Sequence, residues 1–435
     1  MAYQSPYQAF IFDDYSFDPE TNTANFHYSF DGKRNFTEKV TFISSSAAAE
    51  PESSEALERA LQLAFYTAST SYYKAFPTKK VIFKKAQPDA WQAQFLQRIY
   101  TEGLSQFLFE NDFELSDIAT FEAAESESME THYEGEGIIA LQSGGKDSLL
   151  LATLLEEKDI PYTPWYIQYS QSHPSVLDEL KHPLMTAQRS VDIEALKKAQ
   201  SDGGLNGHIP VTYIVLSFAL IEAILQGKNT VLAAIGAEGG EPHEFIGELP
   251  VNHQWAKTWE AEQLFSDYVT YYISTNIHVG SPLRGFSELK IAELFAKHAW
   301  EKFGHSFSSC NKANYEMGAD NSTLKWCGDC PKCANSYLLF APFVEPVELQ
   351  ALFGGEDLFA KARLVETFKG LLGIDGVMKP FECVGETSEL RTAYHMAREK
   401  HGHKVYRLPF EVPKADFDYQ KVRPHNNLEP NFYYL

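Results

Sequence analysis

The spacing of apolar residues changes several times along this chain, and each change predicts a different element. The first part alternates apolar and polar residues as half-buried strands do, with turn signals such as Asp31-Gly32 between the runs. Three strands are expected there, at Ala9 to Phe12, Thr23 to Phe30 and Phe36 to Ile43. Apolar residues then recur at three- and four-residue intervals, which predicts helices over Leu57 to Phe76 and Ala90 to Phe107. We therefore expect residues 1–132 to form an α+β N-terminal domain, with an acidic linker over Glu122 to Glu136.

From Gly137 onward, short apolar runs alternate with helical patterns. Strands are expected at Gly137 to Leu141, Thr163 to Tyr169 and Thr230 to Ile235, with a helix over Val211 to Gln226. This order predicts right-handed crossovers and an α/β fold with a doubly wound parallel sheet over residues 133–345, followed by a largely helical C-terminal region, 346–435. Ligands bind at the carboxyl ends of such strands, so Leu141 and Gly236 should open onto one crevice.

The strongest chemical motif is Ser143-Gly144-Gly145-Lys146-Asp147-Ser148. It follows an apolar strand and precedes the helical pattern that begins at Leu149. Two glycines in a tight turn, small hydroxyl residues and a helix N-terminus favour a bound polyphosphate, although an ordinary strand-to-helix turn can also contain glycines. The spacing differs from the P-loop of kinases and GTPases, which disfavours that kind of phosphoryl transfer.

Composition narrows the class of protein. The chain has 435 residues, enough for two or three domains, and a formal net charge of −22, which disfavours a nucleic-acid substrate because binding to phosphate backbones depends on clustered Lys and Arg. No apolar run approaches the length of a membrane span, and the start lacks a signal-peptide pattern. We expect a cytoplasmic enzyme that acts on a small molecule.

Four of the five cysteines lie close together and suggest a metal site. Cys310, Cys327, Cys330 and Cys333 follow the spacing C-x16-C-x2-C-x2-C. Four thiolates suit a tetrahedral structural Zn²⁺ site, whereas the consecutive x2 spacings also allow an iron–sulfur cluster, and free buried thiols are the plainest alternative. A metal here would fix the segment from Phe307 to Cys333 beside the nucleotide crevice.

Three other residues could have either a structural or a functional role. Cys383 stands alone in an apolar context, as a buried hydrophobe or as a thiol that exchanges a proton with carbon. Arg284 precedes a helical pattern over Glu288 to Phe303, where it could bind a phosphate or carboxylate, or form a structural ion pair. His208 lies at an expected helix N-terminus, where a capping or surface role is favoured over catalysis.

The motif from Ser143 to Ser148 resembles the PP-loop of the ATP pyrophosphatase superfamily, whose members cleave ATP between the α- and β-phosphates and adenylate their substrate. The resemblance implies that Ser143, Gly144, Gly145 and Ser148 hold pyrophosphate and that Asp147 helps to bind Mg²⁺. Lys146 and Lys257 are further candidates for contacts with phosphate.

Most of the chain resembles the UDP-N-acetylmuramoyl-L-alanyl-L-glutamate epimerase family of peptidoglycan-precursor enzymes. The segments that carry the resemblance are Ser143 to Ser148, Asn206 to Thr212, Asn252-His253-Gln254 with Lys257, Cys310-Asn311, Trp326 to Cys333, Ala341-Pro342-Phe343 and Pro380 to Gly385. The sequence departs from the expected family pattern at Ala234 to Glu238, where a more polar segment is typical. The cysteines also resemble those of 7-cyano-7-deazaguanine synthase, although there the first ligand lies much nearer the others.

The resemblance implies ATP-dependent epimerisation of a glutamyl residue through an acyl adenylate, with ATP and Mg²⁺ and a structural Zn²⁺. Two groups must exchange protons on opposite faces of the α-carbon, and Cys383, His253 and His305 are the candidates in that order. His243, Lys257 and Arg284 could supply a locally basic pocket for an anionic UDP-sugar dipeptide. The alternatives are ATP-dependent amidation or thiolation of another small carboxylate or a base, and a module that senses nucleotide without turnover.

Overall fold

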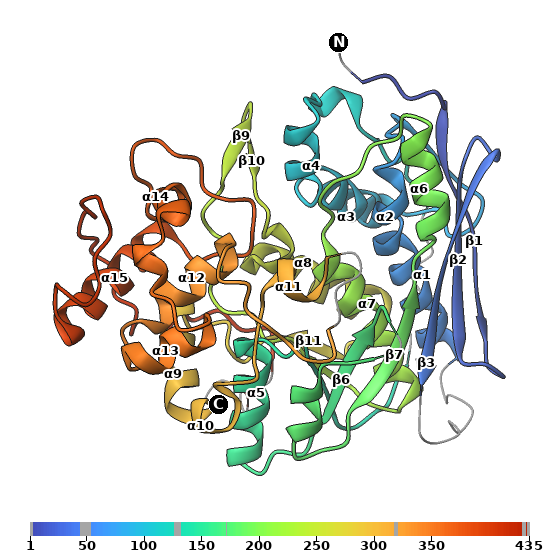
Figure 1. Ribbon diagram of the computed structural model, residues 1–435. Helices are drawn as coiled ribbons and strands as arrows, with labels where there is room; N and C mark the ends of the chain where they lie inside the picture. The colour runs from blue at the N-terminus through green and yellow to red at the C-terminus, as the bar shows by residue number, and fades with distance from the viewer. Residues whose placement is uncertain are drawn as a thin grey trace.

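One nine-stranded sheet runs through the protein. The computed structural model describes residues 3–43, 54–125, 132–170, 172–316, 321–428 and 432. The strands of the sheet are β1 (Ala9–Asp18), β2 (Thr23–Phe30), β3 (Arg34–Ile43), β4 (Lys80–Phe83), β5 (Ile138–Leu141), β6 (Thr163–Gln168), β7 (Met185–Ser190), β8 (Thr230–Leu232) and β11 (His278–Gly280). The two short strands β9 (Glu244–Ile246) and β10 (Leu249–Val251) form a separate hairpin. Figure 1 shows the hairpin projecting between the N-terminal and C-terminal helices.

The strand order reverses its direction at β5. The order is β11-β8-β5-β6-β7-β3-β2-β1-β4, and the five strands from β11 to β7 are parallel to their neighbours. The chain moves from β5 outward to β6 and β7, and then crosses back to β8 on the other side of β5. The direction reverses at β5, and in open α/β sheets ligands bind outside the carboxyl ends of the strands at such a point. Ala140 pairs with Leu232, so the segments after β5 and β8 lie side by side, as the sequence predicted.

Helices cover both faces of this parallel half, which makes it doubly wound. Ile139, Trp165 and Val231 belong to one apolar core, whereas Ile138, Tyr166 and Leu232 face a second core on the opposite side. The helices associated with the first core are α1 (Ser54–Ala68), α2 (Thr70–Tyr73), α3 (Ala90–Thr101), α4 (Ser105–Glu110), α7 (Val211–Leu225) and α8 (Trp259–Tyr272). Those of the second are α5 (Lys146–Glu157), α9 (Glu288–His298), α10 (Trp300–Phe303), α12 (Pro331–Phe340), α13 (Pro346–Leu352), α14 (Val365–Leu372) and α15 (Thr387–His401).

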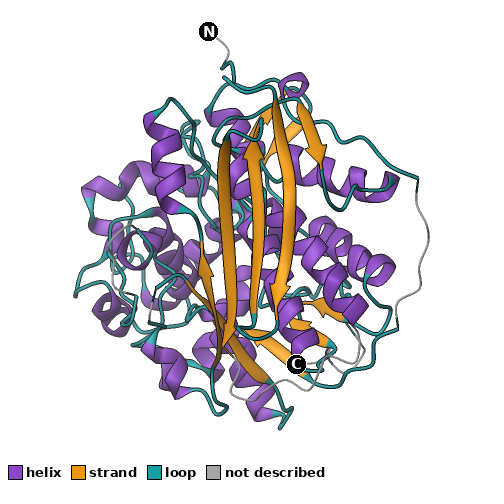
Figure 2. Ribbon diagram, turned by 90° about the vertical axis from the view of Figure 1, so that its right-hand side faces the viewer, coloured by secondary structure: helices purple, strands orange, loops and turns teal. Residues whose placement is uncertain are grey.

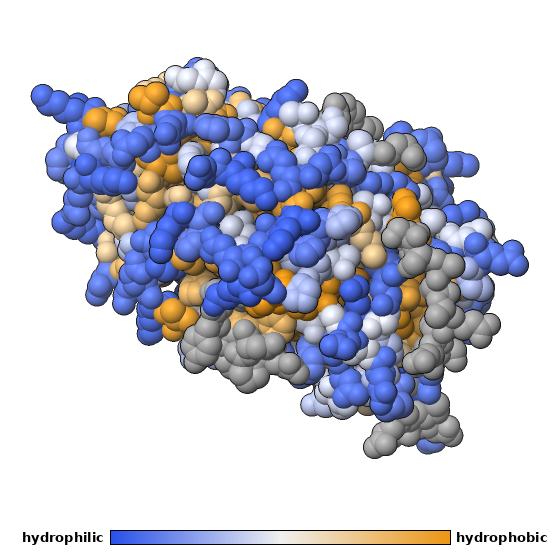
Figure 3. All heavy atoms as spheres, turned by 90° about the horizontal axis from the view of Figure 1, so that it is seen from below, coloured by the Kyte–Doolittle hydropathy of each residue, from blue (hydrophilic) through white to orange (hydrophobic). Residues whose placement is uncertain are grey.

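Shorter elements connect these layers. They are α6 (Ile193–Ser201), α11 (Asn311–Asn314) and five 3₁₀ turns: η1 (Leu115–Asp117), η2 (Ser175–Glu179), η3 (Trp255–Lys257), η4 (Leu358–Ala360) and η5 (Ala362–Leu364). The helical C-terminal region packs beside the parallel half of the sheet, on the side away from β1 to β3 (Figure 1). No helix within the described residues is long and apolar enough to cross a membrane. Seen from below, the surface is mainly hydrophilic with hydrophobic atoms interspersed (Figure 3).

The N-terminal strands continue the same sheet. β3 pairs antiparallel with β7, so β1 to β3 extend the parallel half, and Figure 2 shows them as the longest strands of the sheet. Their buried positions are rich in aromatic residues; for example, the rings of Phe12 and Phe65 are 5.2 Å apart, and those of Tyr28 and Phe65 are 5.1 Å apart. A mixed α/β architecture with a helical C-terminal region is therefore confirmed. The division at residue 132 stays a prediction, because the sheet crosses it.

Several elements differ from those expected. The helix expected over Leu57 to Phe76 is two helices, α1 and α2, and the one over Ala90 to Phe107 is α3 and α4. Gly103 lies at this second break, where an added Cβ would be 3.1 Å from Pro210 and from Trp255, so close packing decides the bend. The pattern over Glu288 to Phe303 is likewise divided into α9 and α10. Part of the acidic segment expected to be a linker, 126–131, lies outside the described residues.

Candidate active site and cysteine cluster

The loop after β5 has the geometry of an anion-binding turn. Gly144 has φ +75°, and an added Cβ would meet Leu324 at 2.5 Å, so only glycine fits. Gly145 is the N-cap residue of α5 and provides no side-chain cap, while its N–H donates to Ser143 Oγ at 3.3 Å. Ser148 Oγ accepts from the N–H of Ser143 at 3.2 Å. The N-terminal end of α5 therefore carries positive dipole charge in a narrow turn, where an anion is stabilised.

Charges at this loop are internally paired. Lys146 Nζ lies 2.6 Å from Asp147 Oδ1 and 2.7 Å from Glu288 Oε2. Burial alone would lower the pKa of Lys146, but the two carboxylates raise it above its ordinary value. Burial raises the pKa of Asp147, and Lys146 opposes that rise. A polyphosphate and its metal ion would compete for both partners in this network.

A cavity of about 450 Å³ lies beside the loop and brings together three of the predicted site residues. His253, Lys257 and Cys383 all line it, although they are far apart in the sequence. Further lining residues are Gly207, His208, Ile209, Pro210, Val211, Thr212, Gln254, Ala256, Asn311 and Lys332. Residues Gly207 to Thr212 of the segment singled out from the sequence therefore form one wall, and the start of α7 faces the cavity.

His253 is held in one tautomer by helix α4. Gln106 Nε2 donates to Glu110 Oε1 at 2.8 Å, which leaves Gln106 Oε1 to accept from His253 Nδ1 at 2.7 Å. The proton is therefore assigned to Nδ1, and Nε2 keeps its lone pair. Burial lowers the pKa of His253 to about 4, with Lys332 and Lys257 contributing and Glu382 opposing. At neutral pH this imidazole is uncharged and can accept a proton at Nε2.

The segment around Cys383 is fastened from several sides. Gln254 Nε2 donates to the carbonyl of Val384 at 2.9 Å, and the N–H of Gly385 donates to Asn335 Oδ1 at 2.9 Å. Asn311 Nδ2 donates to Glu382 Oε2 at 3.1 Å. These contacts on both sides of the half-buried Cys383 fix its place in the cavity wall.

Lys257 lies on the side of the cavity nearest the loop. Its Nζ is 3.4 Å from Glu238 Oε1. Burial would lower its pKa, but Cys383, Glu238, Glu288 and Asp147 together raise it, so Lys257 stays charged. This ammonium group is shared between the loop carboxylates and the cavity.

Arg284 supports Lys257 from behind. Its side chain is 1% exposed and forms an ion pair with Glu262, while Nη1 donates to the carbonyls of Gly236 and Lys257, each at 2.8 Å. The structural ion pair considered from the sequence is therefore present, and Arg284 fixes the backbone of Lys257. It is not among the residues that line the cavity.

The other histidines divide into two groups. The rings of His208 and His253 are 4.3 Å apart, and burial lowers the pKa of His208 to about 3. His243 stacks on Phe381 at 5.1 Å, and burial lowers its pKa to about 4, so it is neutral at pH 7 and adds no positive charge. His305, in contrast, is exposed at the end of α10, beside Trp300, and does not line the cavity.

The four cysteines converge on one point. Their Sγ atoms all lie within 4.8 Å of one another, with 3.6 Å from Cys310 to Cys330, 3.6 Å from Cys327 to Cys333 and 3.5 Å from Cys330 to Cys333. A tetrahedral ion with metal–sulfur bonds of about 2.3 Å places its ligands about 3.8 Å apart. The four sulfurs therefore fit a single ion, whereas the inorganic core of a polynuclear cluster would hold them further apart.

The cysteine cluster lies between the loop and the cavity. The N–H of Ser308 donates to the carbonyl of Gly144 at 3.2 Å, and Ser308 Oγ accepts from the N–H of Cys310 at 3.1 Å. On the other side, Asn311 and Lys332 are next to cysteines of the cluster and line the cavity. One cross-linked segment thus positions residues at both places.

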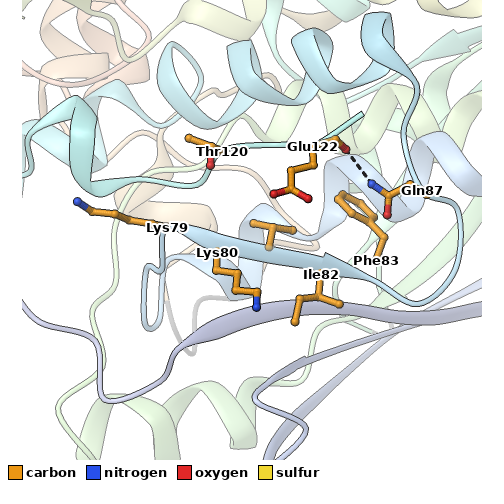
Figure 4. Close-up of a pocket in the computed structure, with 8 residues that line it drawn as sticks. Lys79, Lys80, Ile82, Phe83, Gln87, Thr120 and Glu122 are labelled. Atoms are coloured by element: carbon orange, nitrogen blue, oxygen red, sulfur yellow. Dashed lines mark hydrogen bonds between the residues drawn. The ribbon is translucent and has the colours of Figure 1, made fainter. Parts of the chain in front are cut away.

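A second cavity, of about 390 Å³, lies at the opposite edge of the sheet. It follows β4, where Lys79, Lys80 and Phe83 form part of the wall and Gln87 donates to the carbonyl of Glu122 at 2.7 Å (Figure 4). None of the site residues expected from the sequence lines it. The chemistry therefore concentrates at the cavity beside the loop.

Sequence reasoning missed several residues of this site. Gln106 and Glu110 come from the N-terminal region, and their only signal is a four-residue spacing on one helix face. Lys332 stands between two cysteines of the cluster, where the metal pattern drew attention away from it. Glu288 looked like a helix-starting residue and is also the second partner of Lys146.

Comparisons with known proteins identify the family. The family model described as the MurL N-terminal domain matches residues 1–281, and that of the MurL C-terminal domain matches 306–410. A relative from Xanthomonas oryzae pv. oryzae is 32% identical over 378 residues, which cover 86% of this chain and 82% of the relative. Relatives from Salinispora tropica (32% identical, 91% and 86% covered) and Micromonospora sp. (31%, 90% and 87%) are similar. All three carry the name UDP-N-acetyl-alpha-D-muramoyl-L-alanyl-L-glutamate epimerase, and the chain belongs to this family.

Proposed function

We propose that this protein converts the terminal L-glutamate of UDP-MurNAc-L-Ala-L-Glu to D-glutamate, at the expense of ATP, in the synthesis of peptidoglycan precursors in the cytoplasm. The observation that carries the proposal is that Lys257, His253 and Cys383 line the same cavity beside the loop after β5. The names of the relatives supply the substrate. An ATP-driven epimerisation requires a group that accepts a proton, a second group that delivers one, and a nearby turn that binds phosphate. His253, Cys383 and the loop after β5 are the candidates for these three parts.

The chemistry explains why ATP is needed. Removing the α-proton of a glutamate carboxylate would place a second negative charge on an anion. Transfer of AMP to that carboxylate releases diphosphate and leaves a neutral, electron-poor carbonyl that can delocalise the carbanion. Proton removal on one face, proton delivery on the other and hydrolysis by water then give the D-glutamyl product and AMP. The net cost is one ATP cleaved to AMP and diphosphate.

In this proposal, the loop after β5 holds the leaving diphosphate. Ser143, Gly144, Gly145 and Ser148 form the turn, and Lys146 and Lys257 supply positive charge. Asp147 is the loop carboxylate suited to Mg²⁺, which commonly takes one or two carboxylates and completes its coordination with phosphate oxygens and water. The metal ion would neutralise phosphate charge. Arg284 acts indirectly, by fixing the backbone of Lys257.

His253 and Cys383 are the proton-exchanging pair in this proposal. His253 is neutral at pH 7 and has its acceptor nitrogen free, which suits it to remove a proton. Cys383 lines another part of the same wall, and in this proposal its thiol group exchanges the second proton with carbon. His305 has no part, because it is exposed beside Trp300 and does not line the cavity.

The cysteine cluster is proposed to hold a structural Zn²⁺. The separations of 3.5–3.6 Å between sulfurs suit one tetrahedral ion, and the four protein ligands leave no open position for chemistry. Its contribution is to hold the segment that joins the loop to the cavity wall.

The experiment is incubation of the purified protein with ATP, Mg²⁺ and UDP-MurNAc-L-Ala-L-Glu. AMP and diphosphate are quantified, and the configuration of glutamate is determined by chiral analysis after hydrolysis. We expect one AMP for each D-glutamate formed in the early phase. AMP without D-glutamate, or AMP release that needs ammonia, would point to amidation of a carboxylate instead. Absence of both products would contradict the proposal and favour a module that binds nucleotide without turnover.

A further inference from the structure

The cavity beside the loop differs in charge from the chain as a whole. The chain has 59 acidic and 37 basic residues. The cavity wall nevertheless contains two lysines, Lys257 and Lys332, and no Asp or Glu among the described residues that line it. A pocket of this kind is complementary to an anion, and an anion that enters it meets no opposing carboxylate in the wall.

The two lysines differ in their surroundings. Lys257 lies 3.4 Å from Glu238 and is influenced by Asp147 and Glu288, so it belongs to the side of the loop. Lys332 lies in the first turn of α12 and forms no ion pair with any described residue within 4.0 Å. Its charge is felt at His253, on the side of the cavity formed by the start of α7.

The start of α7 adds to the positive potential near Lys332. This helix has 15 residues, and Pro210, Val211 and Thr212 at its N-terminal end line the cavity. Pro210 provides no side-chain cap, so the positive end of the helix dipole faces the cavity. An ammonium group and a helix N-terminus on one cavity together favour a carboxylate.

We propose that Lys332 and the first turn of α7 bind the γ-carboxylate of the glutamyl residue and thereby select an acidic side chain at the epimerised position. This inference rests on the proposed function. A glutamyl residue carries two carboxylates, and the α-carboxylate must face the loop to be adenylated. The γ-carboxylate must then be desolvated elsewhere in the cavity, which is costly unless a cation pairs with it. Among the residues that the structure describes, Lys332 is the cation on that wall without an ion-pair partner.

The test compares UDP-MurNAc-dipeptides that end in L-Glu or L-Gln, which differ in charge but hardly in size. We expect wild-type kcat/KM to favour Glu by about 100-fold or more, since a site built around a polar partner rejects an analogue that lacks it. Lys332→Gln should lower kcat/KM for Glu about 100-fold, mainly through KM, and reduce the preference to below about tenfold. The Gln substrate should lose little.

The matched control is Lys312→Gln. Lys312 also lies two residues from a cysteine of the cluster, but it is exposed, pairs with Asp329 at 3.8 Å and does not line the cavity. Metal content is measured in both variants, so that loss of the ion is separated from loss of the charge. Lys332→Arg, which keeps the charge, should retain the preference for Glu.

An unchanged Glu/Gln ratio in Lys332→Gln with its metal retained would overturn this inference while leaving the proposed function intact. Failure of wild type to form any D-glutamate would instead contradict the proposed function. Calorimetric binding of the two dipeptide substrates without ATP is then the deciding measurement for the γ-carboxylate site. Wild type that binds both equally, or neither, excludes it.

Discussion

Charged side chains at the loop after β5 form close ion pairs, whereas the wall of the cavity beside it contains a lysine without an ion-pair partner among the described residues. At the loop, Lys146 is paired with Asp147 and Glu288 at 2.6 and 2.7 Å. In the cavity wall, Lys332 has no ion-pair partner among the described residues, and the histidines are neutral. The charge of Lys146 at the loop is thus balanced by neighbouring carboxylates, whereas Lys332 in the cavity wall keeps a charge that no described carboxylate within 4.0 Å balances.

This contrast separates two steps of the proposed reaction. At the loop, an incoming polyphosphate with Mg²⁺ must exchange the partners of Lys146 and Asp147, so charge is redistributed on binding. In the cavity, hydrogen bonds hold His253 and the segment around Cys383 in place beforehand. Variants at the loop should therefore affect adenylation, and variants in the cavity should affect proton exchange.

The largest effect is expected at Asp147. Asp147→Asn removes the loop carboxylate suited to Mg²⁺, so AMP release and D-glutamate formation should both fall by about 1,000-fold, in the range known for a single electrostatic partner in an active site. Rates are measured with both product assays. Asp159→Asn is the control, because Asp159 follows the far end of the same helix and is 88% exposed. Asp147→Asn with unchanged AMP release would remove the loop from the mechanism.

A smaller effect, confined to one step, is expected at His253. His253→Gln removes the proton acceptor, so D-glutamate formation should fall by about 100-fold, as is usual for a lost general base. Substrate-dependent exchange of labelled diphosphate into ATP should persist, because adenylation uses the loop. His305→Gln should leave both rates unchanged. Equal losses of exchange and epimerisation in His253→Gln would break the division between loop and cavity.

Removal of the metal is expected to affect binding more than chemistry. Cys327→Ser should abolish binding of the proposed Zn²⁺ and raise KM for the dipeptide substrate about tenfold, or about 1.4 kcal/mol, because Asn311 and Lys332 lose their support. Zinc is quantified by elemental analysis. Cys383→Ser is the counterpart, since it should keep the metal and lose epimerisation. Iron and inorganic sulfide in the purified protein would instead identify an iron–sulfur cluster.

The smallest expected effect is a shift in the pH dependence of kcat/KM. Because burial holds the pKa of His253 near 4, the base stays unprotonated well below pH 6.5, and kcat/KM should show no acid limb near that value from this group. Lys332 contributes to lowering this pKa, so Lys332→Gln should raise it, by up to about one unit, and move the acid limb to higher pH. NMR titration of the His253 ring checks the same shift. A downward shift would contradict the assigned position of Lys332.

Local pattern predicted the main elements well. β2 begins and ends where it was expected, α7 begins at Val211 directly after Pro210, and β6 differs by one residue. These segments are long or strongly patterned. The strands β4, β7 and β11 were not expected, because their assignment depends on pairing with distant partners rather than on their own sequence. The breaks within the longer helices reflect close packing, as at Gly103.

The parts of the candidate site that are formed by neighbouring residues could be predicted from the sequence. The parts that are formed by residues far apart in the chain could not. Ser143 to Ser148 form one turn, and three of the four cysteines lie within seven residues. The pairing of Lys146 with Glu288 and the support of His253 by Gln106 join residues more than a hundred positions apart. Arg284 shows what sequence alone could not decide. From the sequence, an ion pair and a ligand contact were equally plausible for this side chain, and the fold places Glu262 beside it as an ion-pair partner.

The sequence by itself determined the α/β class, the glycine-rich turn between β5 and α5 and the presence of a cysteine cluster, because each depends on residues that are neighbours along the chain. Only the tertiary structure decided that the N-terminal strands extend the same sheet, that His253, Lys257 and Cys383 share one cavity, and that Lys332 stands there without an ion-pair partner among the described residues. These features depend on which distant segments pack together. Burial and charge pairing follow from that packing, and they set the electrostatics of the site.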